Sequence, residues 1–231
     1  MTFDAVMAEL EAAGSEQTRK TYRRHGIPDP MFGVSFAKLG ELKKRIMRDQ
    51  ALAEQLWATG NADARTLSTM IADPKGQSPA SLDAWVAEAK GHTLAGYVAD
   101  LAARTPFARE MAEAWIARDE EMVTRAGWSV MTLLAMAPQA LSDADCEALL
   151  GRIEKAIHGA MNREKEGMHN ALLAIGMRSD HLEALAIAAA ERIGAIDIDH
   201  GDTACKTPDT IPYIRKGRER ARAKEAKAKA K

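Results

Sequence analysis

The stretch VTRAGWSVMTLLAMAP, residues 123–138, places one arginine in a segment that is otherwise apolar or small. From Met122, just before this stretch, apolar side chains recur at intervals of three and four residues, the spacing of one buried helix face: Met122, Ala126, Val130 and Leu133. Arg125 falls on the neighbouring stripe, in line with Glu121 and Ser129. The stretch therefore predicts an amphipathic helix whose arginine needs a partner.

The same periodicity runs through the rest of the 231 residues, and strand-forming runs are nearly absent. Residues typical of N-caps stand between the apolar stripes: Ser35, Ser78, Thr105, Ser142 and Ser179. Glycines stand at expected helix boundaries: Gly14, Gly26, Gly60, Gly91 and Gly194. Helices of about 10–18 residues with short connectors pair into units of about 35–40 residues, the length of HEAT-like repeats. We expect an all-α fold, an α-α superhelix (solenoid) of HEAT-like two-helix repeats.

Charge is spread unevenly along the chain. Residues 215–231 hold nine Lys or Arg against two Glu, a net charge of +7, whereas the whole chain carries −1. We expect a single repeat domain over 1–214 and a basic tail, rich in Ala, Lys and Arg, over 215–231. The tail is either a solvated segment, helical or disordered, or an arm that attracts a polyanion such as a phosphate backbone. The polar, Gly- and Pro-containing segment 196–214 predicts an ordered loop that leads to a short helix.

The cysteine content and the absence of long apolar runs indicate the cellular compartment. The two cysteines, Cys146 and Cys205, are too few and too far apart for a disulfide framework. The sequence shows no charged-then-apolar leader and no apolar run of about 20 residues. We expect a cytoplasmic protein without a membrane segment.

Two partners are open for Arg125. An ion pair with Glu121, one helical turn earlier, would lie on a solvated face and contribute only a few tenths of a kcal/mol. Alternatively, Arg125 lines the inner surface of the solenoid, where its forked guanidinium suits phosphate oxygens.

Three stretches then carry a family likeness. They are DPMFGVSFAKLGELKKRI at 29–46, RTPFAREMAEAWIARDEEMVTRAGWSVMTLL at 104–134, and NALLAIGMRSDHLEALAIAAAERIGAIDIDHGDTACKTP at 170–208. In this order they resemble segments of the DNA alkylation repair family, the AlkD-like DNA glycosylases built from HEAT-like repeats. The resemblance implies an enzyme that binds duplex DNA, in some cases alkylated, in a concave groove. It also implies that this enzyme excises N3- or N7-alkylated purines.

The resemblance also places the family's site residues. A tryptophan and an aspartate, spaced W-x-x-x-D, face the DNA backbone near the lesion, and the matching positions here are His92 and Gly96. The chain is thus similar to a divergent branch that lacks the catalytic Trp/Asp pair. Asp100 lies four residues further on, about 6 Å along the axis, and is a weak substitute for the missing acid. Arg125 matches the family's phosphate-side arginine.

Further DNA contacts are expected from cations and one aromatic residue. With Arg125 the expected nucleic-acid-binding set is Trp128, Arg178, Lys206, Lys43 and Lys44. Trp128 is open to two interpretations, repeat packing or base stacking. Lys43 and Lys44 are equally consistent with a solvated helix face.

A metal site is the remaining chemical possibility. His200, Asp202 and Cys205 lie within six residues, but no matching ligand pair occurs elsewhere. We expect no metal and no cofactor, and interpret this segment as a loop in which Asp199 and Asp202 bond to backbone amides and Cys205 packs as a small apolar residue.

These observations favour a DNA-binding protein of the alkylpurine glycosylase-like family whose catalytic competence is doubtful. Two alternatives stay open. One is a HEAT-repeat scaffold that binds protein, since such repeats bind peptides as readily as DNA. The other is an active glycosylase with a relocated acid. The lesion recognised and the oligomeric state are left undetermined by the sequence.

Overall fold

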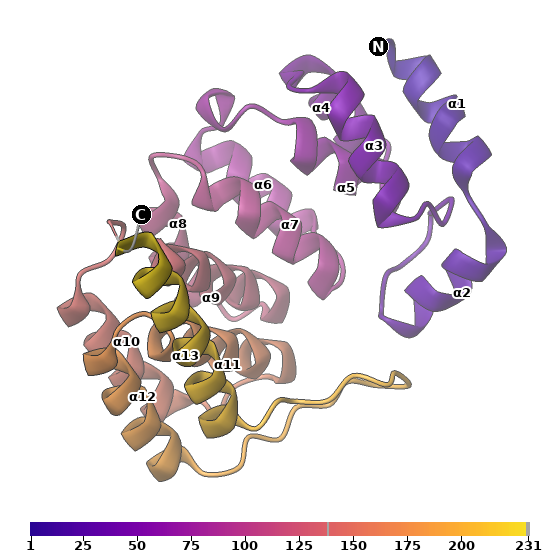
Figure 1. Ribbon diagram of the computed structural model, residues 1–231. Coiled ribbons are helices and arrows are strands. Elements are labelled where there is room, and N and C mark those ends of the chain that lie inside the picture. Colours follow the sequence, from indigo (N-terminus) through magenta and orange to yellow (C-terminus); the bar gives the residue numbers. More distant parts are fainter. Residues whose placement is uncertain (138, 230–231) are drawn as a thin grey trace. The chain divides into compact units, whose positions relative to one another are not determined.

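The structure is a computed structural model that describes residues 1–137 and 139–229 (Figure 1). Within these residues it contains thirteen α-helices, one short 3-10 helix and no strand. The all-α prediction is therefore confirmed. Residues 138 and 230–231, which belong to the opening stretch and to the expected tail, lie outside the described part. No helix in that part combines the length and apolar character needed to cross a membrane.

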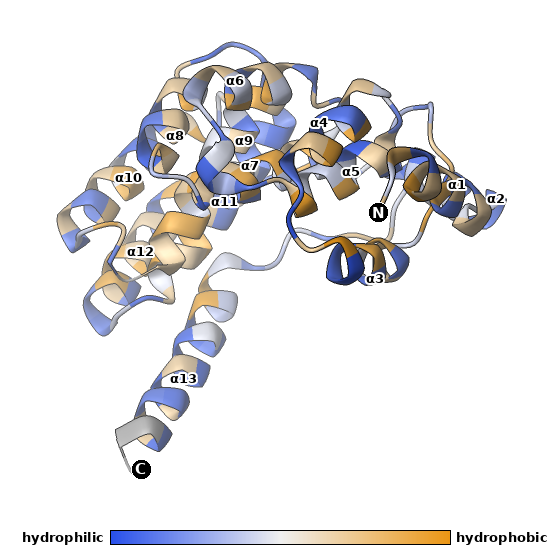
Figure 2. Ribbon diagram, turned by 90° about the horizontal axis from the view of Figure 1, so that it is seen from above, coloured by the Kyte–Doolittle hydropathy of each residue, from blue (hydrophilic) through white to orange (hydrophobic). Residues whose placement is uncertain are grey.

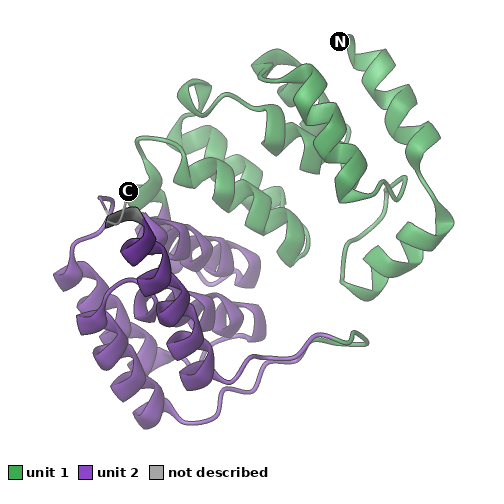
Figure 3. Cartoon of the chain, viewed as in Figure 1, with its two compact units in different colours: residues 1–111, 200–204 green, residues 112–199, 205–231 purple. Residues whose placement is uncertain are grey.

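The chain folds into two compact units (Figure 3). The first comprises residues 1–111 and 200–204, and the second comprises residues 112–199 and 205–231. The expected division into a repeat domain over 1–214 and a tail over 215–231 stays a prediction. The main division falls near residue 111, and residue 214 lies inside a helix.

The first unit is built around one central helix. Its helices are α1 (Phe3–Ala13), α2 (Glu16–Arg24), α3 (Phe36–Ile46), α4 (Gln50–Ala58), α5 (Ala62–Ile71), the 3-10 helix η1 (Pro74–Gly76), α6 (Pro79–Glu88) and α7 (His92–Ala103). α5 packs against α1, α3, α4 and α7. Most of α5 is buried for this reason, including Leu67 and Ile71.

The second unit has two layers of helices. Helix α8 (Ala108–Ile116) spans the division between the units, and the second unit continues with α9 (Glu121–Met136), α10 (Asp143–Ala156), α11 (Asn162–Gly176), α12 (Asp180–Ile193) and α13 (Thr210–Lys229). α11 packs against α9, α12 and α13, and α10 packs against α11 and α12. Figure 2 shows apolar and polar residues alternating along these helices, as amphipathic packing requires.

Most predicted N-caps are confirmed. Ser35 and Ser179 each accept a backbone N–H three residues on, and Ser78 and Ser142 form complete capping boxes. Thr105 differs because α8 begins only at Ala108. Its hydroxyl donates to the carbonyl of Ala102 at 2.8 Å, at the end of α7, and accepts the backbone N–H of Phe107 at 3.3 Å, on the side of α8.

The glycines at helix boundaries differ in their roles. Gly26, Gly60 and Gly194 have φ of 72°, 70° and 73°, the left-handed region expected at helix ends. Gly91, with φ of 85°, begins α7 instead of ending a helix. Gly14 has φ of −68°, so its requirement is space: a Cβ there would lie 2.4 Å from the carbonyl oxygen of Phe32.

Segment 32–34 of the FGVS motif is fixed by a buried carboxylate. Asp63, in the first turn of α5, is only 2% exposed. It accepts the backbone N–H groups of Phe32 at 2.6 Å, Gly33 at 2.9 Å and Val34 at 3.0 Å. One side chain therefore ties the approach to α3 onto α5.

The expected basic tail is an ordered helix through its described residues. Ile214 is fully buried, and Arg218 is 6% exposed. Arg218 binds Asp180 of α12 at 2.8 Å and Glu225 of α13 at 2.7 Å, while Arg222 binds Asp180 at 2.9 Å and also Glu183. Acidic residues of α12 thus hold the first turns of the basic segment in place.

Candidate nucleic-acid interface

Arg125 lies at the contact between α9 and α11. Its side chain is 11% exposed, and its Nε is 3.4 Å from Oε2 of Glu166 on α11. Its Nη1 is 3.5 Å from the hydroxyl of Ser129, which itself donates to the carbonyl of Arg125 at 2.9 Å. The guanidinium is therefore held between two helices. It does not extend from a solvated face.

A second arginine shares the same carboxylate. Arg163, in the first turn of α11, binds Oε2 of Glu166 at 3.1 Å, and its side chain is 18% exposed. Arg125, Arg163 and Glu166 form what we call the α9–α11 cluster. Two guanidinium groups on one carboxylate leave one positive charge without a partner inside the cluster.

Glu121 does not pair with Arg125 as the helical spacing suggests. Its Oε1 accepts the backbone N–H of Arg163 at 2.7 Å, so it caps the start of α11. This capping matters because Met161, the N-cap residue, makes no side-chain cap. The expected Glu121–Arg125 pair is therefore corrected to Glu166–Arg125, a partner 41 residues away.

Burial lowers the pKa of Arg125, and the charge of Glu166 opposes that shift. An arginine side chain is charged at any physiological pH even so. Its charge is thus retained in a partly dry setting, where a charge-assisted bond is stronger than in water. An anionic phosphate could accept from these guanidinium groups in place of Glu166.

Trp128 is a core residue. It is 1% exposed, and a Cβ added at Gly167 of α11 would lie 2.8 Å from its Cβ. The guanidinium of Arg152 lies over the ring, 5.6 Å from its centroid. At 1% exposure the ring of Trp128 is buried, which favours the packing interpretation over base stacking.

Arg178 is also committed to the protein. It follows α11 with its side chain 12% exposed, and it donates to the carbonyl oxygens of Leu141 and Ala135. Asp143 at the start of α10 lies 3.8 Å from its Nε. These contacts tie the connection between α9 and α10 to α11. A DNA contact by Arg178 stays a prediction.

The three expected lysines are exposed. Lys43 and Lys44 occupy the last turn of α3, where cations complement the helix dipole. Lys206 lies in the loop after α12. Exposure is consistent with a phosphate contact for all three, which stays a prediction.

The loop after α12 is fastened by an asparagine. Asn162 accepts the backbone N–H of Asp199 at 2.7 Å and donates to its carbonyl at 2.8 Å. Cys205 is exposed, which corrects the expectation that it packs as an apolar residue. Across residues 1–137 and 139–229, no three His, Cys, Asp or Glu side chains gather as metal ligands.

Comparison with known proteins places the chain. A family model described as DNA alkylation repair enzyme matches residues 6–206. The chain belongs to the DNA alkylation repair enzyme family. A solved structure described as "a new family of proteins related to the HEAT-like repeat DNA glycosylases with affinity for branched DNA structures" is similar at 32% identity, with a TM-score of 0.88 and 96% of each chain covered. This match also confirms the predicted HEAT-like repeat fold.

Two curated relatives are similar over nearly their full length. The uncharacterized protein Lin0241 of Listeria innocua is 29% identical over 230 residues, covering 95% of this chain and 99% of its own. The uncharacterized protein Lmo0209 of Listeria monocytogenes is 29% identical over 232 residues, with 96% and 100% covered.

Helix α7 carries the two positions at which the family resemblance expects catalytic residues. His92 is the first residue of α7, and Gly96 follows one turn later. The weak substitute Asp100 is exposed and pairs with Arg104 at 3.1 Å. Its charge is therefore already compensated, which does not favour a role as the relocated acid of this family member.

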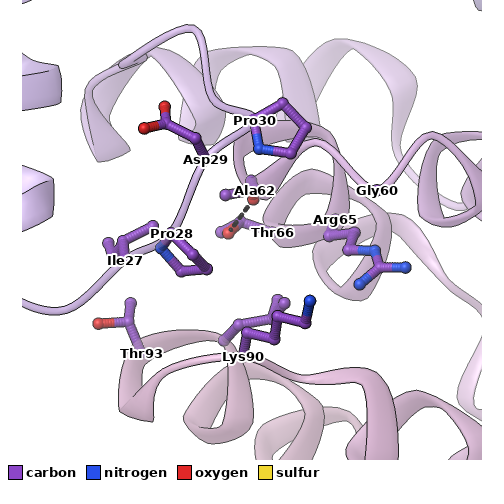
Figure 4. Close-up of a pocket in the computed structure, with 11 residues that line it drawn as sticks. Ile27, Pro28, Asp29, Pro30, Gly60, Ala62, Arg65, Thr66, Lys90 and Thr93 are labelled. Atoms are coloured by element: carbon purple, nitrogen blue, oxygen red, sulfur yellow. Dashed lines mark hydrogen bonds between the residues drawn. The ribbon is translucent and has the colours of Figure 1, made fainter.

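A pocket of about 220 Å³ lies beside the start of α7, between segment 27–30 and α5 (Figure 4). Three of its polar side chains are already bound. Asp29 pairs with Arg23 at 3.1 Å, and Thr66 donates to the carbonyl of Ala62 at 2.8 Å. Arg65 donates to the carbonyl of Trp57 and pairs with Glu88. Lys90 and Thr93 also line the pocket.

Sequence reasoning missed the cluster partners of Arg125. Arg163 and Glu166 lie three residues apart, which is the spacing of a helical ion pair and was the available signal. The packing of α11 against Arg125 is a tertiary contact, and no local sequence pattern predicts it.

Proposed function

We propose that this member of the DNA alkylation repair enzyme family binds branched DNA, with the duplex arms as the main contact, and does not excise alkylated bases. The observation that carries the proposal is the full-length likeness to the protein described as having affinity for branched DNA. At 32% identity and a TM-score of 0.88, that relative offers the same framework for the same ligand class.

The α9–α11 cluster supports the proposal chemically. Its two arginines are positioned before any ligand arrives, because Glu166 holds both. A phosphate that accepted from Arg125 would lose less side-chain entropy than one bound by a flexible lysine.

Helix α13 is a second source of positive charge. Arg218 and Arg222 are engaged with acidic residues, which fixes the rotation of the helix. Exposed cations on its remaining surface make no ion pair with described residues: Arg215, Lys216, Arg220, Lys224 and Lys227. This ordered helix suits backbone phosphates better than the acidic remainder of the chain does.

Helix α7 supports the proposed absence of excision. Excision of an alkylated purine is assisted by a carboxylate near the developing oxocarbenium ion. The family position for that carboxylate is Gly96, and the nearby Asp100 is paired with Arg104. The framework is thus proposed to bind without the acid.

Binding is tested by fluorescence anisotropy with a four-way junction, a forked duplex and a linear duplex of matched arm sequence. We expect tighter binding to the branched DNAs, and a linear fall of log K with log salt. Arg125→Ala should weaken binding to all three DNAs by about tenfold and reduce the salt slope by about 1. The variant Arg125→Lys retains the positive charge, so it separates the effect of charge on DNA binding from an effect of the substitution on folding.

Arg192→Ala is the matched control. Arg192 is 58% exposed and pairs with Glu154 on the α10–α12 side of the second unit. The Arg192→Ala variant removes one arginine charge, as Arg125→Ala does, but at a different position. It should leave the DNA affinity within about twofold of the native value. Equal losses in Arg125→Ala and Arg192→Ala would argue against a specific role for Arg125, and no salt-dependent binding at all would favour the protein scaffold.

Excision is tested separately, by release of 7-methylguanine and 3-methyladenine from alkylated duplex DNA. The native protein should release neither, and Gly96→Asp should restore the family's carboxylate position. Release by the native protein that Arg125→Ala abolishes would instead show an active glycosylase with a relocated acid.

A further inference from the structure

Three aromatic rings form a row in the first unit. The ring of Phe36, the first residue of α3, lies 5.5 Å from that of Tyr22 on α2 and 5.8 Å from that of Tyr97 on α7. Tyr22 is 8% exposed, and its hydroxyl donates to the carbonyl of Val34 at 2.6 Å. The row is therefore anchored at one end and pre-positions the ring in its middle.

Phe36 itself is 41% exposed. Its neighbours on the helix surface extend the opening, because Gly40 and Lys43 follow at i+4 and i+7. A Cβ at Gly40 would meet nothing within 4 Å, so this stripe is open to solvent. The adjacent side of α3 packs into the core through Leu39 and Leu42.

The charge of this surface is positive. Lys43 and its neighbour Lys44 form no ion pair with described residues, whereas Lys38 pairs with Glu41 at 3.2 Å and Arg45 with Glu9 at 2.7 Å. The carboxylate of Asp100, whose charge acts on Tyr97, is compensated by Arg104. We call Phe36, Gly40, Lys43 and Lys44 the α3 outer face.

We propose that the α3 outer face binds unpaired nucleotides of DNA, with a base stacked on Phe36 and the following backbone phosphates at Lys43 and Lys44. Aromatic rings beside cations are the usual combination for a single strand, because every base has a π face and every linkage a negative charge. Phe36 and Lys43 are about 10 Å apart along the helix axis. That separation leaves room for the sugar between a stacked base and a bound phosphate.

Charge favours DNA over an apolar protein partner at this face. A helix docking in a groove is recognised through continuous apolar anchors, whereas two uncompensated lysines follow the single ring here. Gly40 removes the side chain between ring and lysines, so a sugar-phosphate backbone can approach closely. This inference rests on the proposed function. It specifies that the first unit contacts the unpaired bases at the branch of a branched DNA.

The test uses a forked duplex with 2-aminopurine in its unpaired arm, next to the branch, and the matching linear duplex. Binding of the native protein should quench the 2-aminopurine fluorescence. Phe36→Ala should abolish the quenching and weaken fork binding about tenfold, with linear duplex binding unchanged. Phe36→Trp should restore both, and thermal unfolding of each variant verifies the fold.

Two further variants sharpen the result. Lys43→Ala with Lys44→Ala should lower the salt slope for the fork by about 2 and leave the slope for the linear duplex unchanged. Tyr213→Ala removes another exposed aromatic ring, 48% exposed on α13, and should leave the ratio of fork to duplex affinity unchanged. An unchanged ratio in Phe36→Ala would overturn this inference alone. Absence of all DNA binding by the native protein would overturn the proposed function with it.

Discussion

At the scale of the residue, Asp63 fixes the FGVS motif, although nothing in the sequence of that motif indicates this partner. Its carboxylate accepts three consecutive backbone N–H groups, from Phe32 to Val34. Burial raises the pKa of Asp63, while the three hydrogen bonds oppose that shift by favouring the charged form. The FGVS segment is therefore held by its backbone, through a residue about 30 positions later.

Asp63→Ala should lower the free energy of unfolding by about 3 kcal/mol or more, because three buried N–H groups would lose their acceptor. Asp63→Asn keeps one carbonyl acceptor and should have a smaller effect. Urea denaturation followed by circular dichroism measures both. Asp49→Ala removes an ordinary N-cap at α4 and is the matched control, with an expected cost of about 1 kcal/mol. Equal effects at the two positions would contradict the role assigned to Asp63.

At the scale of the element, α13 is fastened by charge as well as by apolar contact. Arg218 and Arg222 hold the pKa of Asp180 below its ordinary value. A carboxyl group with a lowered pKa in the folded state stabilises that state above its unfolded pKa. The contribution is lost as pH falls below 3.8, through the lowered pKa of the folded state.

Amide hydrogen exchange should therefore show α13 opening at acidic pH before the core of α11 does. Asp180→Asn should weaken the protection of α13 at neutral pH and reduce its dependence on pH. Glu154→Gln is the control, because the pKa of Glu154 is also lowered by an arginine but its pair joins α10 to α12. Protection of α13 that is the same at pH 7 in Asp180→Asn and in the native protein would argue against this anchor.

The elements also show what local sequence can and cannot predict. The helices and most N-caps followed from residues such as Ser78 and Ser142, whose partners lie three positions away. The order of α13 did not follow, because its anchors, Asp180 and Glu183, lie on another helix. Arg125 shows the same limit at the candidate site: the local spacing favoured Glu121, whereas packing supplied Glu166.

At the scale of the whole molecule, the distribution of charge decides how DNA binding responds to salt. The chain is nearly neutral, yet the described part of α13 keeps exposed cations along one helix. Replacing Lys216, Arg220, Lys224 and Lys227 by Ala should reduce the salt slope by about 3–4 if all four meet phosphates. Anisotropy titrations at several salt concentrations measure this slope, and an unchanged slope would remove α13 from the interface.

The composition of the first unit has a consequence for how the protein is made. That unit includes residues 200–204, which lie far along the chain from its other residues, 1–111. Because a ribosome synthesises the chain from its amino terminus, most of the second unit leaves the ribosome before residues 200–204 of the first unit do. An expression fragment that ends near residue 111 would therefore lack a piece of the unit it is meant to isolate.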